Sequence, residues 1–158
     1  MYTVAVLTIS DKCSKGERED GTGRVVQGLV KKFPLELVKY EIVPDELKII
    51  KKKLVEYSDK LKINLVLTNG GTGFGPRDVT PEATKEVLNK EVLGIPEAMR
   101  ISCINKEKRA MLSRAASGIR GKTLIVNLPG SPKAAKESLE PVIEALIHGL
   151  DMIAGKGH

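Results

Sequence analysis

Apolar and β-branched residues are concentrated in four runs along the chain, and each run predicts a strand. The runs cover residues 2–9, 35–43, 64–68 and 123–128. The second run alternates imperfectly between apolar and polar residues and stops at Pro44, which is typical of a strand towards the edge of a sheet. The other three are richer in apolar residues, as expected of strands that helices cover on both faces.

Apolar residues at helical spacing follow these runs. Helices are predicted after Gly23 and after Asp45, and shorter ones at 81–88 and 94–105. A last helix covers the segment from Ala135 to Leu150, and Pro141 inside it should kink or split it. The polar, glycine-containing residues 12–23 predict either a mobile loop or lid, or a plain solvated connection.

The composition favours an α/β fold in a single domain. The chain has 158 residues, of which 41% are hydrophobic but only 3% aromatic, and it has no tryptophan. The core must therefore be built from Val, Ile, Leu and Ala, which suits strands covered by helices on both sides. We expect one domain over residues 1–154 and a frayed tail over 155–158.

Charge and cysteine usage narrow the class of protein. The formal net charge is +6, but the lysine clusters contain no interleaved aromatic residues, so no nucleic-acid partner is expected. Met1 leads directly into a strand pattern and no apolar run approaches the ~20 residues that span a bilayer, so neither a signal peptide nor a membrane segment is expected. Cys13 and Cys103 lack metal-type spacing, which predicts reduced thiols in a cytoplasmic protein.

A glycine-rich loop after the third strand is the main candidate for chemistry. Its residues of interest are Gly70, Gly71, Thr72, Gly73, Arg77 and Asp78. Glycines allow successive N–H groups to turn towards an anion, Arg77 offers a fork for phosphate, and Asp78 is a potential Mg²⁺ ligand. Thr80 and Pro81 predict the start of a helix with a hydroxyl cap. The loop therefore suggests phosphate chemistry, with a long strand-to-helix turn as the alternative.

Two better-known phosphate motifs do not match this loop. A P-loop ends in Gly-Lys-Ser or Gly-Lys-Thr, whereas Gly75 is followed by Pro76 and Arg77. The dinucleotide fingerprint requires a glycine three positions after its second, where this chain has Pro76. Both classes of nucleotide site are therefore excluded.

Two further strand ends carry candidate ligand groups. Asp45 follows the second strand, where it predicts the N-cap of the next helix or, paired with Asp78, a Mg²⁺ site on a nucleotide. Ser131 follows the last strand and predicts a helix cap whose free N–H groups bind an anion, or only a tight turn. Two such loops in one domain suggest a ligand with two phosphate-bearing ends.

Five blocks of sequence, in the right order and at the right separations, resemble the molybdopterin adenylyltransferase family, which includes MogA and the G domain of gephyrin. The blocks are residues 7–11, 43–46, 70–84, 111–114 and 127–130. The insert Phe74-Gly75-Pro76 is similar to the gephyrin form of the loop. The resemblance covers nearly the whole chain, although residues 12–20 follow the family only loosely.

The resemblance implies a three-layer α/β/α domain with a mostly parallel sheet, assembled as a homotrimer. It implies a step of molybdenum cofactor biosynthesis, in which AMP passes from Mg-ATP to the terminal phosphate of molybdopterin and pyrophosphate is released. Because the chain stops after one domain, a separate molybdate insertase is implied as a partner.

The resemblance also implies roles for particular residues. Asp45 and Asp78 would serve catalysis by holding Mg²⁺ at the triphosphate. Ser10 and Asp11 would lie near the adenylyl end. The other predicted binding residues, near the pterin or the nucleotide, are Gly70, Gly71, Thr72, Gly73, Arg77, Ser113, Arg114, Asn127, Pro129, Gly130 and Ser131.

Three other functions fit parts of the sequence. A non-catalytic molybdopterin carrier or scaffold of MoaB type would share the fold but would not need the pair Asp45 and Asp78. A nucleotide hydrolase would use water in place of the pterin phosphate. A basic nucleic-acid module would rest on the net charge alone and would show steeply salt-dependent binding.

Overall fold

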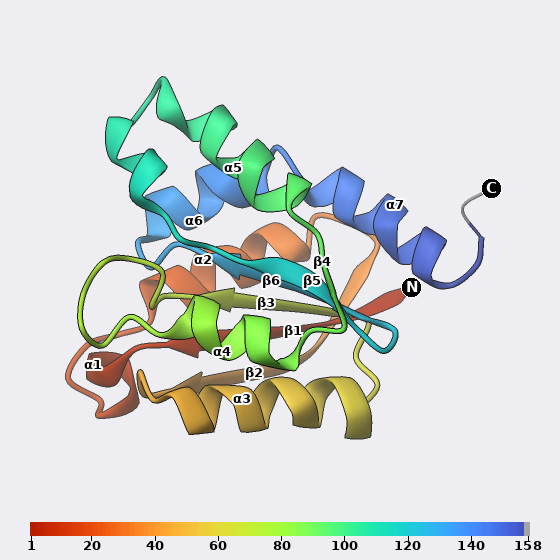
Figure 1. The fold of residues 1–158 in the computed structure, drawn as a ribbon, viewed down its shortest axis with the longest axis horizontal. Helices are drawn as coiled ribbons and strands as arrows, with labels where there is room; N and C mark the ends of the chain where they lie inside the picture. Colours follow the sequence, from red (N-terminus) through yellow and green to blue (C-terminus); the bar gives the residue numbers. More distant parts are fainter. Residues whose placement is uncertain (157–158) are drawn as a thin grey trace.

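Six strands form one sheet at the centre of the molecule (Figure 1). The computed structural model describes residues 1–156. The strands run in the order β2 (Leu35–Val43), β1 (Tyr2–Ile9), β3 (Leu65–Asn69), β6 (Thr123–Leu128), β5 (Ser117–Arg120) and β4 (Lys90–Glu91). The first four are parallel, whereas β5 is antiparallel to β6 and β4 to β5. The predicted mostly parallel α/β sheet is confirmed, with β2 at one edge.

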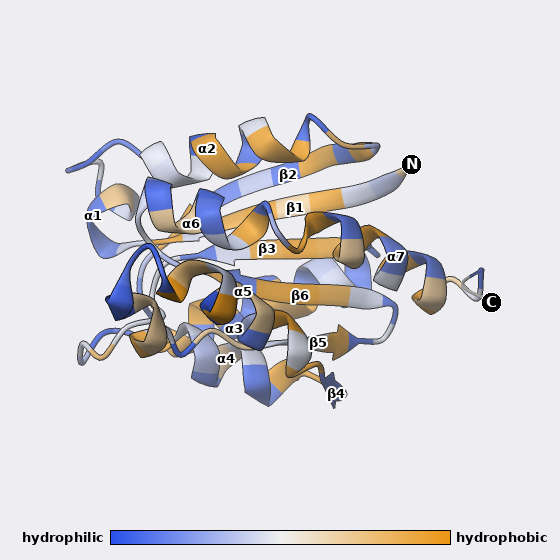
Figure 2. Ribbon diagram, turned by 90° about the horizontal axis from the view of Figure 1, so that it is seen from above, coloured by the Kyte–Doolittle hydropathy of each residue, from blue (hydrophilic) through white to orange (hydrophobic). Residues whose placement is uncertain are grey.

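Helices cover both faces of the sheet, so the molecule has three layers (Figure 1). One face carries α2 (Gly21–Val30), α5 (Gly94–Ile104), α6 (Pro132–Leu139) and α7 (Ile143–Ile153), and the other carries α3 (Leu47–Val55) and α4 (Thr80–Val87). Alternate residues of the strands face the two layers: Val4 and Val6 pack with α2, α6 and α7, while Ala5 and Leu7 pack with α3 and α4. The central strands are therefore buried on both sides, and Figure 2 shows their hydrophobic stretches.

The C-terminal part of the fold agrees with the sequence pattern. The predicted last helix is split at Pro141, since α6 ends at Leu139 and α7 begins at Ile143. Of the predicted tail, Gly155 and Lys156 still donate backbone hydrogen bonds to α7, and residues 157–158 lie outside the described part of the chain. The boundary of the domain at residue 154 stays a prediction.

Several short elements were not predicted. The segment expected to be a loop begins with a helical turn, α1 (Asp11–Ser14), and the strands β4 and β5 were missed. A π-helical turn, Glu56–Lys60, extends α3, and a 3-10 turn, Lys108–Leu112, follows α5. Among the described helices, none is long and apolar enough to cross a bilayer, and the cytoplasmic location stays a prediction.

Two predicted helix caps are wrong and one is confirmed. Asp45 does not cap α3, which begins at Leu47; its carboxylate instead accepts a hydrogen bond from the backbone N–H of Asp11. The Thr80 hydroxyl does not cap α4 either, because it donates to the carbonyl oxygen of Gly70 at 2.9 Å. Ser131 does cap α6, since its hydroxyl oxygen accepts from the N–H of Ala134 at 3.2 Å.

Candidate active site

The predicted site residues gather where the parallel strands end. Because β1, β2, β3 and β6 run in the same direction, their carboxyl ends lie at one edge of the sheet. Ser10 and Asp11 follow β1, Asp45 follows β2, the loop from Gly70 follows β3, and residues 129–131 follow β6. Figure 1 shows α1 and the loop after β3 at the same end of the molecule. Ligands of open α/β sheets bind at this edge.

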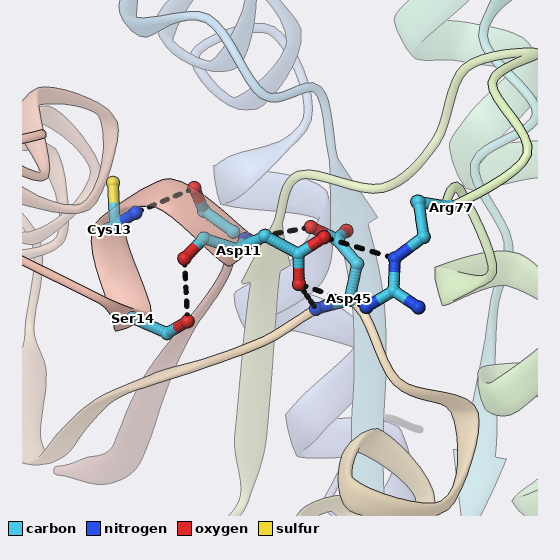
Figure 3. A network of polar contacts seen from close by, with 6 residues as sticks. Asp11, Cys13, Ser14, Asp45 and Arg77 are labelled. Atoms are coloured by element: carbon cyan, nitrogen blue, oxygen red, sulfur yellow. Dashed lines mark hydrogen bonds and ion pairs between the residues drawn. The ribbon is translucent and has the colours of Figure 1, made fainter. Parts of the chain in front are cut away.

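Asp11 and Asp45 are joined by a reciprocal pair of hydrogen bonds (Figure 3). The N–H of Asp11 donates to Oδ2 of Asp45 at 2.9 Å, and the N–H of Asp45 donates to Oδ1 of Asp11 at 3.0 Å. From the glycine-rich loop, the Arg77 guanidinium donates to both carboxylate oxygens of Asp11 at 3.1 Å. The ends of two strands and the loop are therefore held together around two carboxylates.

The two carboxylates have opposite electrostatic environments. Burial raises the pKa of Asp45 above its ordinary value, and the charges of Asp11 and Asp78 add to this, although the N–H of Asp11 acts in the other direction. The pKa of Asp11 is lowered, chiefly by the hydrogen bonds from Arg77. Arg77 thus compensates the charge of Asp11 rather than that of Asp45, and a divalent cation would favour the ionised form of Asp45.

The glycine-rich loop passes directly beside these aspartates. Gly71 has a φ of +70°, and a Cβ there would lie 2.2 Å from Oγ1 of Thr80 and 3.2 Å from Oδ1 of Asp45. Only glycine can fill this position, because any side chain would collide with the start of α4. Further along the loop, Oδ2 of Asp78 accepts a hydrogen bond from the N–H of Gly75 at 2.8 Å. This bond fixes the orientation of the Asp78 carboxylate relative to the loop.

Arg114 braces the loop from the opposite side. Its guanidinium donates to the carbonyl oxygens of Gly73 and Asp78, each at 2.8 Å, and to Oε2 of Glu82 at 2.7 Å. Its backbone N–H donates to the carbonyl oxygen of Thr72 at 2.9 Å. The sequence predicted a ligand contact for Arg114, whereas the structure shows a residue engaged in positioning the loop.

Four predicted binding residues line neither of the two clefts described below, namely Asp11, Arg77, Arg114 and Asn127, and of these Asn127 is the fully buried one. Its side chain is fully buried; Oδ1 accepts from the N–H of Ala116 at 3.0 Å, and Nδ2 donates to the hydroxyl oxygens of Thr68 and Thr84 at 3.0 and 2.9 Å. These bonds use its polar atoms inside the protein, so its role is to join β6 to β3 and α4. The prediction that Asn127 binds substrate is replaced by this structural role.

Two clefts at this edge contain most of the remaining predicted residues. The first, which we call the polar cleft, has a volume of about 560 Å³ and includes Ser10, Asp45, Gly70, Gly71, Asp78, Gly130 and Ser131. The second, the apolar cleft, has a volume of about 670 Å³ and includes Thr72, Gly73, Ser113, Pro129 and Ser131. Ser131 lines both clefts, so they adjoin at the start of α6.

The polar cleft also contains groups that the sequence did not single out. Asp20 caps α2 by accepting from the N–H of Gly23 at 2.8 Å, and Thr22 donates its hydroxyl to the carbonyl oxygen of Gly130 at 2.7 Å. The N-termini of α2 and α6 are thereby tied together at one cleft, where their free N–H groups and dipoles favour an anion. An acidic residue directly before Gly21, where α2 begins, was the available signal for Asp20.

The apolar cleft has a hydrophobic floor and a charged rim that were not predicted either. Met99 and Pro96 of α5 and Leu112 line it, together with Lys133 and with Arg109, which is paired with Glu107 at 3.0 Å. The periodicity of α5 marked Met99 as a core residue, and nothing in the sequence indicates that the helix borders a cleft. Such a surface suits a flat, largely apolar ring that carries a negative charge.

The described residues contain no group of three or more His, Cys, Asp or Glu side chains arranged to hold a metal ion. Asp45 and Asp78 line the same cleft as a pair of oxygen donors. Magnesium is commonly bound through one or two carboxylates, with phosphate oxygens and water completing its shell. The donor set therefore fits Mg²⁺ that arrives with a nucleotide.

Comparison with known proteins identifies the family. Residues 5–148 match the family described as "Probable molybdopterin binding domain", and the chain belongs to it. It is 44% identical over 155 residues to the molybdopterin adenylyltransferase of Helicobacter pylori J99, covering 96% of this chain and 88% of that protein. It is 40% identical to gephyrin of Dictyostelium discoideum, covering 98% of this chain but 23% of that protein.

The fold is shared with a solved relative. The molybdopterin biosynthesis enzyme MoaB of Thermus thermophilus is 50% identical, with a TM-score of 0.94 over 99% of this chain and 98% of that one. Family and fold predicted from the sequence are thus confirmed.

Proposed function

We propose that the protein is a molybdopterin adenylyltransferase of molybdenum cofactor biosynthesis. An oxygen of the terminal phosphate of molybdopterin attacks the α-phosphorus of ATP, the bond from that phosphorus to the bridging oxygen breaks, and pyrophosphate leaves. The names of the relatives support this reaction. The single observation that carries it is the placement of Asp45 and Asp78 in a polar cleft that adjoins an apolar one.

The chemistry of the clefts suggests where each substrate binds. The polar cleft, with two helix N-termini, would take the triphosphate, and Asp45 and Asp78 would hold Mg²⁺ there. When bound, the ion would offset the charge of the phosphates. The apolar cleft would take the pterin ring, with Arg109 and Lys133 at its charged groups. The reacting phosphates would then meet beside Ser131, which both clefts share.

The remaining task of the protein is positioning. A phosphate nucleophile is already an anion at neutral pH, so no general base is required. Arg114 and the reciprocal bonds between Asp11 and Asp45 hold the loop and the strand ends. In the proposed reaction, this rigid frame would align the two polyanions. Arg77, which pairs with Asp11 and has a 59% exposed side chain, can approach an incoming phosphate.

We also propose that a separate insertase adds molybdate to the product. The match to the Dictyostelium gephyrin covers 98% of this chain but only 23% of gephyrin, so gephyrin contains a long region that has no counterpart in this match. A non-catalytic molybdopterin carrier is the second candidate function. The 50% identical relative from Thermus thermophilus is a MoaB, the type expected of such a carrier, although it too is named a molybdopterin biosynthesis enzyme.

The test is an anaerobic incubation of the protein with molybdopterin and Mg-ATP, followed by mass spectrometry of the pterin. Adenylyl-molybdopterin and pyrophosphate are expected from the parent, and at least about 100-fold less from Asp45→Asn or Asp78→Asn, the order expected for lost electrostatic stabilisation. Asp59→Asn is the control, because Asp59 pairs with Arg120 at 2.7 Å and lines neither cleft. Pterin binding without product, in the parent, would favour the carrier.

A further inference from the structure

Phe74 is an aromatic side chain left in water beside the apolar cleft. Its relative exposure is 72%, and it is the one aromatic among the described residues that line the two clefts. The other phenylalanine, Phe33, packs against the core. An exposed phenyl ring lacks the stabilisation that burial of apolar surface would give. A ligand that covers this ring at the cleft would therefore gain binding free energy.

The backbone around Phe74 is fixed while its ring is free. Gly73 is held through its carbonyl oxygen by Arg114 at 2.8 Å, and Gly75 through its N–H by Asp78 at 2.8 Å. A Cβ on either glycine would lie 2.9 Å from Oδ2 of Asp78, so a side chain flanking Phe74 would displace this carboxylate. The two anchors leave rotation of the ring about its own side-chain bonds as the principal motion.

The cleft beside Phe74 offers contacts to one face and the edges of a flat ligand. Met99, Pro96 and Leu112 supply apolar surface, and Lys133 supplies positive charge, whereas Arg109 is paired with Glu107 of the same cleft at 3.0 Å. What these residues lack is an aromatic face. A planar heteroaromatic ring bound there would gain an offset-stacked partner from Phe74, an arrangement that an aliphatic or sugar ligand cannot use.

We propose that Phe74 is a specificity-determining residue that rotates over the apolar cleft and stacks on the bicyclic pterin ring. This inference rests on the proposed function and adds a selection step to it. The ring distinguishes a pterin phosphate from other organic phosphates, since binding of the phosphate alone leaves Phe74 in water. It also covers the bound ring and keeps water away from it.

The affinity for molybdopterin, measured anaerobically from pterin fluorescence, tests the contact. We expect Phe74→Ala to raise the Kd by roughly 10-fold, the scale of losing one stacked and buried ring, and Phe74→Leu to raise it less. The Kd for Mg-ATP should be unchanged in both variants. Leu61→Ala is the control, because Leu61 is 48% exposed and lines neither cleft.

A spectroscopic readout separates stacking from a loss of structure. The natural chain has no tryptophan, so Phe74→Trp introduces a single reporter. Its emission should be quenched by molybdopterin but not by Mg-ATP, whereas the emission of Leu61→Trp should change with neither.

Each contrary result has a distinct meaning. If the parent binds molybdopterin and Phe74→Ala binds it within about 2-fold, or Phe74→Leu binds it as the parent does, the stacking role is overturned while the proposed function stands. A parent that binds no molybdopterin overturns both.

Discussion

Asp45 illustrates how a half-buried carboxylate can lower the stability of the fold. Its pKa is raised in the folded protein by burial and by neighbouring carboxylates, so its ionised form is less favourable in the folded than in the unfolded chain. The stability that it contributes is complete below the ordinary pKa of an aspartate and is lost as the pH rises through the raised value. At neutral pH the ionised carboxylate of Asp45 therefore makes the folded protein less stable than it would be with a neutral side chain at this position.

We predict that Asp45→Asn abolishes adenylylation and yet unfolds at a higher urea concentration than the parent at pH 7. The amide oxygen can still accept from the N–H of Asp11. The advantage should shrink as the pH falls, because the parent carboxyl then becomes neutral too. Urea titrations of both proteins between about pH 4 and pH 8 measure the difference. A variant less stable than the parent at pH 7 would show that the ionised carboxylate supports the fold.

At the level of elements, the long ones could be predicted from the sequence and the short ones could not. Apolar runs in the sequence predict the strands β1, β2, β3 and β6, and Pro141 predicts the break between α6 and α7. By contrast, β5 contains only four residues, two of them Ser117 and Gly118, and exists because it pairs with β6. Such pairing depends on tertiary contacts that local propensity does not contain.

The same reasoning explains which candidate residues the fold brings into one cleft. Asp45 follows β2, and Asp78 lies in the glycine-rich loop after β3. Because parallel strands end at the same edge of the sheet, the two carboxylates line one cleft. Asn127 stands within β6, and only the direction of its side chain, into the core, decides its role. Arg114 was expected near a ligand from the family resemblance, and the sequence contains no sign that the carbonyl oxygens of Gly73 and Asp78 would occupy its donors.

Asn127 joins three elements, and its removal should be costly. We predict that Asn127→Ala lowers the free energy of unfolding by roughly 2–4 kcal/mol, since the hydroxyls of Thr68 and Thr84 and the N–H of Ala116 lose a buried partner. Urea denaturation measures this value. The exposed Asn105 provides the matched control, and Asn105→Ala should remain within about 0.5 kcal/mol of the parent. An equally stable Asn127→Ala would mean that the buried network is not needed.

On the scale of the whole molecule, exposed apolar residues around α5 suggest an interface between copies of the chain. Leu93, Ile101, Met111 and Leu112 have relative exposures of 61%, 71%, 56% and 45%. Water-exposed apolar groups gathered in one region are typical of protein contacts. The homotrimer implied by the family resemblance would require a contact of this kind, and Leu112 also lines the neighbouring apolar cleft.

We predict that light scattering of the parent gives three times the chain mass of 17.2 kDa. Ile101→Glu should lower this mass, because a charge at a buried contact is left unpaired. Val38→Glu, on the edge strand β2 with a relative exposure of 45%, should not. A parent that elutes with the mass of one chain at micromolar concentration would contradict the trimer.

The central claim is that an adenylyl group moves from ATP to molybdopterin, and an isotope label tests it most directly. The protein would be incubated anaerobically with molybdopterin, Mg²⁺ and ATP labelled with ³²P at either the α or the γ position. We predict that the α label appears on the pterin and the γ label in pyrophosphate, with neither transfer in Asp45→Asn. Release of the γ label as inorganic phosphate, with an unlabelled pterin, would contradict adenylyl transfer and indicate a nucleotide hydrolase.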